Sequence, residues 1–338
     1  MNNEIYLSFF MFTADLQPDN AEYTQTIIRH IRHLTEYGYT GFDLPIVPTM
    51  DPESDVEKYV KLKRAIDEAG LGHVKFTTNV FAPRTFDPSS PFAEQRALGL
   101  KYLKSRVDIT AALGGHIMAG PIVIPYNVFP TTDLWQPIWS DALQDWAAPR
   151  YENARPIFEE LGAYAAANNV KLAIEPVDHW ETPAPNMVGE VLAFLERVKS
   201  PQIGVCIDSA HVVLGSQGPA SFVESANRAA AMGRVHYVQI SAPDRGAVHD
   251  SWIPWTAFLD TVLPAYDGPL LVEVFNAIPV FLNPLRLTRR KFWIPDEDRP
   301  VKDWPSAYVV ALEAILEVRQ QLEAQSAPRI KLASGAPI

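Results

Sequence analysis

Short runs of apolar, β-branched and aromatic residues alternate along the chain with longer segments in which apolar residues recur every three or four positions. The short runs have the composition of buried β-strands, and the longer segments have the periodicity of amphipathic α-helices. We expect strands over residues 5–12, 41–46, 73–80, 116–124, 171–176, 203–208, 235–241 and 270–275. We expect helices over residues 21–38, 55–70, 155–170, 187–198, 219–233, 255–263 and 306–322.

Eight strands alternating with helices in a chain of 338 residues predict an α/β protein of the (β/α)8 TIM barrel type. A doubly wound open sheet is the alternative, but no Gly-x-Gly-x-x-Gly motif follows the first strand. Because no repeat or linker divides the chain, residues 1–323 are expected to form a single domain. Residues 324–338 are expected to be a loosely ordered tail. Long loops are expected after strand four (125–154) and strand eight (276–305).

Composition narrows the class of protein. Apolar residues make up 47% of the chain, yet none of the apolar runs approaches the 18 residues of a membrane span. The N-terminus does not resemble a secretory signal, and the single cysteine, Cys206, fits a reducing compartment such as the cytoplasm. The net charge of −11 argues against a nucleic-acid-binding surface, which would need a basic face.

The last four predicted strands each end in, or carry near their end, a residue that can bind a metal ion. These residues are Glu175, Asp208, Gln239 and Glu273, and His211 follows three positions after Asp208. In a (β/α)8 barrel the carboxyl ends of the strands meet at one mouth, where the active site lies. Three carboxylates brought together there would repel one another without a cation. An oxygen-rich set suits Mn²⁺, Mg²⁺ or Co²⁺ better than a structural zinc ion.

Each of these residues has a structural alternative. A single acidic residue at a strand end is often the N-cap of the following helix. Gln239 could be an ordinary polar strand residue, and His211 could be a hydrogen-bonded structural histidine. We nevertheless expect a shared metal site, because several such residues converge on one mouth.

Six segments resemble the xylose isomerase-like superfamily, and within it the ketose 3-epimerases: "GFDL", "GP" after strand four, "IEPVDHWE", "IDSAH", "HYVQISAPDR" and "GPLLVEVF". The resemblance covers strand two and strands four to eight. It implies a divalent ion, Mn²⁺ first, held by Glu175, Asp208, Gln239 and Glu273. It also implies that the substrate hydroxyls are contacted by Glu181, His211 and Arg245. Gln239 is a departure, since the epimerases carry histidine there, whereas the similar hydroxypyruvate isomerases carry glutamine.

The resemblance, together with this site chemistry, implies a metal-dependent sugar isomerase- or epimerase-like enzyme. A divalent ion acidifies the proton next to a carbonyl, and two glutamates, Glu175 and Glu273, could exchange protons with either face of the sugar. Return of the proton to the opposite face gives an epimer, and return to the neighbouring carbon gives an isomer. An unphosphorylated substrate is favoured, because "SAPDRG" offers one arginine and no glycine-rich phosphate nest.

The two long loops suggest a more specific alternative. Residues 125–154 are rich in aromatic side chains, among them Trp135 and Trp139, which we expect to contact the substrate unless they pack the loop or a subunit interface. "IEPVDHWETP", "SAPDRGAVHDSWIPW", "EVFNAIPVF" and "LRLTRRKFW" resemble the α subunits of bacterial C-glycoside deglycosidases. That resemblance implies a carbon–carbon lyase acting on 3-oxo-C-glucosides with a small partner subunit, and it makes His179 an acid/base near the aglycone. The basic residues of 286–291 are expected to form a solvated or interface surface.

Other classes fit less well. A binding barrel without catalysis would be expected to lack one of the paired glutamates, and an apurinic-site endonuclease would need several metal-binding histidines and a basic face. A xylose isomerase proper would supply a catalytic lysine and an aspartate-rich second metal site. For partners, we expect a small sugar or glycoside substrate and a homo-oligomer, or a hetero-oligomer with a small subunit.

Overall fold

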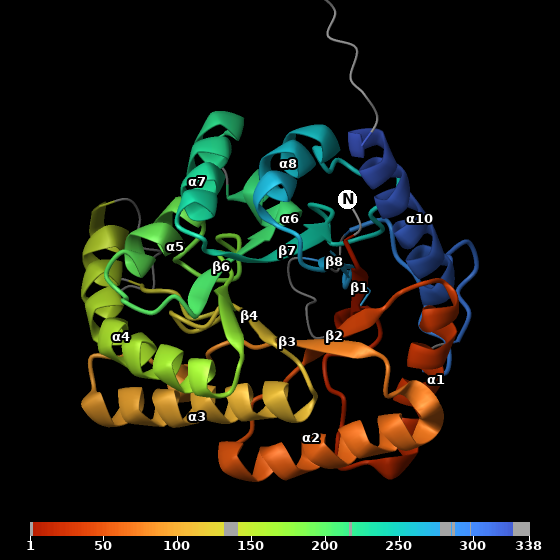
Figure 1. The fold of residues 1–338 in the computed structure, drawn as a ribbon, viewed down its shortest axis with the longest axis horizontal. Helices are drawn as coiled ribbons and strands as arrows, with labels where there is room; N and C mark the ends of the chain where they lie inside the picture. Colours follow the sequence, from red (N-terminus) through yellow and green to blue (C-terminus); the bar gives the residue numbers. More distant parts are fainter. Residues whose placement is uncertain are drawn as a thin grey trace, which may run out of the picture.

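The computed structural model describes residues 3–131, 141–215, 218–277, 285, 288–297 and 299–326. Eight parallel strands form a closed barrel in chain order, with β8 paired to β1 (Figure 1). This confirms the predicted (β/α)8 barrel. The strands are β1 (Ile5–Ser8), β2 (Gly41–Pro45), β3 (Lys75–Asn79), β4 (Ile117–Gly120), β5 (Lys171–Ile174), β6 (Ile203–Asp208), β7 (Val235–Ser241) and β8 (Leu270–Glu273).

The α-helices surround the strands as an outer layer (Figure 1). Their bounds are α1 (Ala21–Glu36), α2 (Pro52–Ile66), α3 (Ala93–Ala112), α4 (Asp141–Ala167), α5 (Val188–Leu195), α6 (Ser209–Leu214), α7 (Pro219–Ala231), α8 (Trp255–Val262) and α10 (Ala307–Ser326). Short helical turns lie at η1 (Phe9–Met11), η2 (Asp67–Leu71), η3 (Arg84–Phe86) and η4 (Leu263–Ala265). Among the described helices, none is long and apolar enough to cross a membrane.

The structure differs from the sequence-based expectation in several places. The first strand ends at Ser8 and is followed by η1, and β4 ends at Gly120, so both strands are shorter than expected. Helices α3 and α6 are present where no helix was expected. Helix α4 begins at Asp141, so part of the expected loop 125–154 is helical. Helix α10 continues to Ser326, and residues 327–338 of the expected tail lie outside the described residues.

Helix α1 shows how the local sequence sets an element. The Asn20 side chain accepts hydrogen bonds from the main-chain N–H groups of Glu22 and Tyr23, which caps the first turn. Its apolar face buries Ile27, Ile28, Ile31 and Leu34 against the barrel. The helix ends before Gly38, which has φ +99°, a conformation that favours glycine.

Helix α3 has a mixed polar and apolar buried face, so its sequence lacks a clear apolar stripe. Its largest buried side chain is Arg106, which donates to Asp55 Oδ2 at 2.6 Å. Arg106 also donates to the carbonyls of Val47 at 3.0 Å and Pro52 at 3.2 Å. The arginine therefore fastens α3 to the start of α2.

Replacing Arg106 with methionine is expected to lower the free energy of unfolding by about 3–5 kcal/mol, because Asp55 would lose its buried arginine partner. Urea unfolding followed by circular dichroism measures this change. Lys101→Met is the control, because Lys101 is half exposed and its ion pair with Glu53 should contribute about 1 kcal/mol or less. Equal losses in the two variants would contradict the structural role of Arg106.

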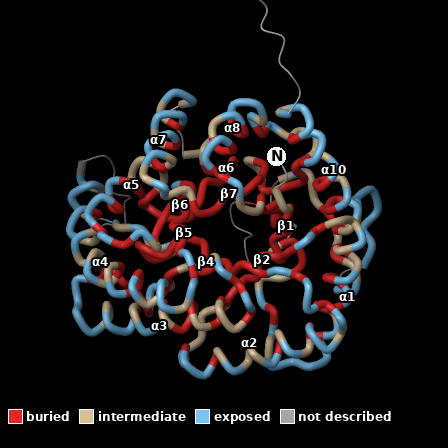
Figure 2. The backbone as a smooth tube through the Cα atoms, viewed as in Figure 1, coloured by how far each residue is buried: buried red, intermediate tan, exposed pale blue. Residues whose placement is uncertain are grey.

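The buried apolar residues of the strands and helices form one continuous core. The strands are almost entirely buried, and exposed residues concentrate on the outer faces of the helices (Figure 2). Inside the barrel, Thr77 donates to Asp43 Oδ1 at 2.5 Å and lies 2.8 Å from the Tyr237 hydroxyl. This small polar group sits among apolar side chains.

Candidate active site

Strand register brings the predicted metal-binding residues together at the carboxyl ends of β5 to β8. Asp208 on β6 is paired with Gln239 on β7, and Ser241 on β7 is paired with Glu273 on β8. Gln239 and Ser241 are two residues apart, so their side chains share one face of the strand. Glu175 follows β5 directly. The convergence expected from the sequence is therefore present in the fold.

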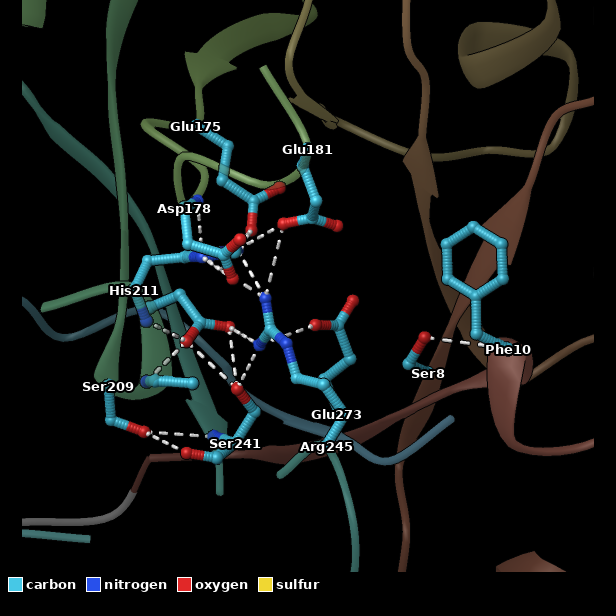
Figure 3. Close-up of polar contacts among 12 residues, drawn as sticks. Ser8, Phe10, Glu175, Asp178, Glu181, Ser209, His211, Ser241, Arg245 and Glu273 are labelled. Carbon is cyan, nitrogen blue, oxygen red and sulfur yellow. Dashed lines mark hydrogen bonds and ion pairs between the residues drawn. The ribbon is translucent and has the colours of Figure 1, made fainter. Parts of the chain in front are cut away.

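The mouth of the barrel is strongly acidic (Figure 3). Five carboxylates, each no more than 6% exposed, gather there: Glu175, Asp178, Glu181, Asp208 and Glu273. Buried charges of one sign are unfavourable unless cations or hydrogen bonds offset them. The donors and cations that approach this cluster therefore determine what it can do.

Asp208 combines two of the roles considered from the sequence. Its Oδ1 accepts hydrogen bonds from the main-chain N–H groups of Ala210 at 2.6 Å and His211 at 3.2 Å, which caps α6. Its Oδ2 faces the cluster and accepts from the Ser241 hydroxyl at 2.9 Å. The N-cap interpretation and the site interpretation are thus compatible.

The Gln239 side chain meets two of the carboxylates. Its terminal amide group lies 3.1 Å from Glu175 Oε1 and 3.1 Å from Asp208 Oδ2. With the amide nitrogen turned toward them, Gln239 donates two hydrogen bonds. With the amide oxygen turned toward them, three oxygens face one point, as in the coordination shell of a hard divalent cation. Ligand atoms of Glu175, Asp208 and His211 also lie within 4.8 Å of one another. The donor set therefore fits a divalent cation.

Arg245 lies among the carboxylates (Figure 3). Its Nη1 is 3.2 Å from Asp208 Oδ2 and 3.4 Å from Glu273 Oε2, and its Nη2 is 3.7 Å from Glu181 Oε2. Nη1 also donates to the Ser241 hydroxyl. One guanidinium thus balances part of the negative charge on three sides.

His211 connects the cluster to the segment after β5. Its Nδ1 accepts a hydrogen bond from the main-chain N–H of Asp178 at 2.9 Å, and its Nε2 contacts Arg245 Nη2. Nε2 faces Glu175 Oε1 at 3.3 Å and Glu181 Oε2 at 3.6 Å. The Tyr126 hydroxyl, from the β4–α4 segment, donates to Glu181 Oε1 at 3.3 Å.

The surroundings of the carboxyl groups shift their pKa values in different directions. Burial raises the pKa of Glu273 well above its usual value, although Arg245 opposes this. Burial likewise raises the pKa of Glu181 to about 7, against His211 and Arg245. For Asp208, burial is outweighed by Arg245 and His211, which lower its pKa. Carboxyl groups with raised pKa values beside one with a lowered pKa are typical of acid/base sites.

Asp43 gives a test of the electrostatics deeper in the barrel. Burial raises its pKa from 3.8 to about 7; the Thr77 hydrogen bond opposes the rise and the charge of Glu175 adds to it. Between about pH 4 and 7, Asp43 therefore carries a proton in the folded protein, whereas it is ionised in the unfolded chain. Asp43 should therefore reduce the free energy of unfolding as the pH rises, by up to about 1.4 kcal/mol per pH unit.

Urea unfolding of the wild type and of Asp43→Asn from pH 4 to pH 8 measures this effect. The stability of the wild type relative to D43N should fall through that window, because the asparagine does not titrate. Asp303→Asn, at an exposed position, controls for the loss of one carboxyl group. Parallel curves for the wild type and D43N would show that Asp43 titrates normally.

Not every predicted site residue is placed in this cluster. Glu181, His211 and Arg245 lie in it together with the four predicted metal ligands. His179 is exposed, although its neighbours Asp178 and Glu181 point inward. Trp135 and Trp139 lie outside the described residues.

Three residues of the cluster were not predicted. Ser241 could have been found from strand alternation, because it lies two residues after Gln239. Asp178 binds His211 through its main-chain N–H, which no residue type signals. Tyr126 reaches Glu181 through the path of the β4–α4 segment, which local sequence does not give.

Residues 31–293 match the xylose isomerase-like TIM barrel family. The chain belongs to this family. Its curated relatives include a ketose 3-epimerase of Arthrobacter globiformis, 24% identical over 262 residues, which span 76% of this chain and 82% of the relative. This membership of the xylose isomerase-like TIM barrel family confirms the predicted resemblance and, at the level of the family, the predicted isomerase- or epimerase-like enzyme.

Two solved structures of the same architecture are informative. A candidate sugar phosphate isomerase/epimerase from Anabaena variabilis is 56% identical, with a TM-score of 0.93 over 96% of this chain and 99% of that one. A D-allulose 3-epimerase from Methylomonas sp., in complex with D-allulose, is 20% identical, with a TM-score of 0.71 over 95% of this chain and 98% of that one. The second likeness concerns the fold alone.

Proposed function

We propose that this protein is a divalent-metal-dependent enzyme that removes and returns a proton at the carbon next to the carbonyl of an unphosphorylated keto sugar. The observation that carries the proposal is the convergence of Glu175 and Glu273, from β5 and β8, on one buried cluster with Asp208 and Gln239. A ketose 3-epimerase among the relatives supports the same class of reaction.

The metal would be held by Glu175, Asp208, Gln239 and Glu273, with Mn²⁺ as the first choice and Mg²⁺ or Co²⁺ as alternatives. When bound, such an ion supplies Lewis acidity toward the sugar carbonyl. Oxygen donors of this kind leave the ion electrophilic, whereas thiolates would reduce its charge.

The residues of this chain would handle the proton. One of the two glutamates, Glu175 or Glu273, takes the proton from the sugar carbon through a carboxylate oxygen, and the other returns a proton to the opposite face. Burial raises the pKa of Glu273 above its usual value, which brings it closer to the range in which a carboxyl group both takes up and returns a proton. Glu181, His211 and Arg245 would bind and orient the sugar hydroxyls.

The charge of the mouth favours a substrate without a phosphate group. Five buried carboxylates would repel a phosphate, and Arg245 is already engaged with Asp208 and Glu273. The Anabaena variabilis protein is named for a sugar phosphate, so a phosphorylated ketose belongs in the test.

A second candidate is elimination of an aromatic aglycone from a 3-oxo-C-glucoside. It is favoured by large apolar side chains exposed on segments that follow strands: Met50, Phe92, Phe129 and Trp252, the last of them 91% exposed. Such side chains could receive a flat aromatic group. This alternative would add a small partner subunit; otherwise we propose a homo-oligomer. A cytoplasmic location stays a prediction.

Proton exchange in D₂O, followed by NMR with Mn²⁺-loaded protein, separates these functions. D-fructose, D-tagatose, D-fructose 6-phosphate and a 3-oxo-C-glucoside of a flavonoid are offered in parallel. We expect deuterium to enter a free ketose as a second sugar forms. Release of free flavonoid with the ketoses untouched would instead establish the lyase, and exchange confined to the phosphate would overturn the unphosphorylated substrate. No reaction with any of the four compounds would contradict both functions for this chain without a partner subunit.

A further inference from the structure

Arg245 occupies a backbone conformation that needs support. Its φ is +55°, in the left-handed region, which costs a residue with a side chain about 1–2 kcal/mol. Such a conformation persists where surrounding contacts hold it. Because Arg245 also points its guanidinium into the acidic cluster (Figure 3), the contacts that hold its backbone also control where that charge lies.

The segment after β8 supplies the first of these contacts. The Arg245 carbonyl accepts hydrogen bonds from the main-chain N–H groups of Phe275 at 3.0 Å and Asn276 at 3.1 Å. The next residue, Gly246, leaves little room, since an added Cβ would lie 2.8 Å from Asn276 Nδ2 and 3.0 Å from Asp244 Oδ2. The turn around Arg245 is therefore closely packed against the chain that follows β8.

Arg290, which lies 45 residues after Arg245 in the chain, supplies a second set of contacts to this turn. Its guanidinium forms a bidentate ion pair with the Asp244 carboxylate, in which Nε lies 2.9 Å from Oδ2 and Nη2 lies 2.5 Å from Oδ1. Its Nη1 donates to the carbonyls of Ala247 at 2.8 Å, His249 at 3.2 Å and Asp250 at 3.1 Å. A single planar side chain thus binds both sides of the turn that carries Arg245.

Arg290 is also fixed from its own side. Asn276 Nδ2 donates to the Arg290 carbonyl at 3.1 Å. Asn276 therefore contacts both Arg245 and Arg290 and joins the two segments. These contacts use the Arg290 guanidinium within the protein, whereas the sequence predicted that the basic cluster faces solvent or a subunit interface.

We propose that Arg290 is a positioning residue that holds Arg245 at the substrate site through Asp244. The inference rests on the proposed function, in which Arg245 binds a sugar hydroxyl. Loss of the ion pair between Arg290 and Asp244 would release the turn and let the Arg245 guanidinium move away from the cluster. Lysine cannot replace Arg290, because an ammonium cannot form the planar two-point contact with Asp244.

The test compares Arg290→Met, Arg290→Lys and Asp244→Asn with Arg289→Met in the Mn²⁺-loaded enzyme. Arg289 is the matched control, because it is the neighbouring arginine and is exposed. We expect R290M to raise KM for the exchanging ketose by about 10²-fold, since displacing a binding group by about 1 Å has an effect of that size. R290K and D244N should raise KM in the same direction, and R289M should match the wild type.

A double-mutant cycle with Arg245→Met distinguishes positioning from a general loss of structure. R245M should raise KM by itself, and adding R290M to it should have little further effect, because the group being positioned is already gone. Mn²⁺ affinity, measured by competition with a chelating dye, should be unchanged in R290M, since Arg290 contacts none of the proposed ligands. Additive effects on KM, or a wild-type KM in R290M, would overturn the inference.

The outcomes also separate this inference from the proposed function. If R245M leaves KM unchanged, the substrate role of Arg245 fails and the positioning role fails with it. If R245M raises KM and R290M does not, the proposed function stands and only the positioning role is wrong. Hydrogen–deuterium exchange of residues 244–250 needs no substrate, and it should be faster in R290M than in R289M. Equal exchange in the two variants would show that Arg290 does not hold the turn.

Discussion

Replacing Glu273 with glutamine is expected to abolish turnover of the ketose, with a fall in kcat of about 10²–10⁴-fold, while the fold remains intact. Glutamine has the same shape and can still offer an oxygen to a cation, but it cannot take up or return a proton. Glu273 lies at the end of β8, is 3% exposed and lies 3.4 Å from Arg245. Its replacement should therefore slow proton transfer at the sugar carbon. NMR-detected exchange in D₂O measures the effect.

Two controls make the result specific to proton transfer. Because Glu273 is also a proposed ligand, the Mn²⁺ affinity of E273Q is measured and exchange is assayed at Mn²⁺ concentrations that saturate the variant, which separates lost chemistry from lost metal. Glu313→Gln, on α10, removes a partly exposed glutamate that is paired with His249, and it should leave kcat unchanged. Activity retained by E273Q would refute the mechanism with two glutamates.

Exhaustive removal of divalent ions is expected to abolish exchange, and addition of Mn²⁺ is expected to restore it. Exchange should stop because the proposed reaction needs the Lewis acidity of the ion. The ion should also stabilise the fold, because it offsets the repulsion among the five buried carboxylates that face Arg245 and His211. Mn²⁺ at about 100 times its Kd should add about 2.7 kcal/mol to the free energy of unfolding. Thermal unfolding with and without Mn²⁺ measures this gain.

Asp208→Asn should lose most of the Mn²⁺-dependent stabilisation, because it removes a proposed ligand. Asp19→Asn is the control, since Asp19 is exposed and pairs only with Lys58 among the ion pairs of the described residues. Exchange that survives complete chelation, or a stability that does not respond to Mn²⁺, would show that the acidic cluster works without a metal.

The barrel could be predicted because its strands and most of its helices follow simple periodic patterns. Helix α3 could not, since it buries Arg106, whose charge is satisfied by Asp55 and by carbonyls distant in sequence. Arg290 was misjudged for the same reason, as an arginine that binds Asp244 looks like a solvated one until the chain is folded. Periodicity reveals apolar burial and does not reveal buried charge with a distant partner.

The proposed metal ligands could be predicted because parallel strands bring their carboxyl ends to one mouth, whatever lies between them. The residues that complete the site could not be predicted in the same way. Tyr126 enters from the segment after β4, and Asp178 acts through its main-chain N–H. Both depend on how loops turn, which the local sequence leaves open.

The five carboxylates of the mouth all come from β6, β8 or the segment directly after β5. From the segments after β1 to β4, Tyr126 reaches the cluster by donating to Glu181, and Phe10 packs against Phe275 after β8. This separation makes the barrel modular. Under the proposed function, mutations that change which sugar is accepted are expected in the first half of the chain, while the residues proposed to transfer the proton stay intact. Directed evolution for new substrates should therefore start from libraries in the segments after β1 to β4.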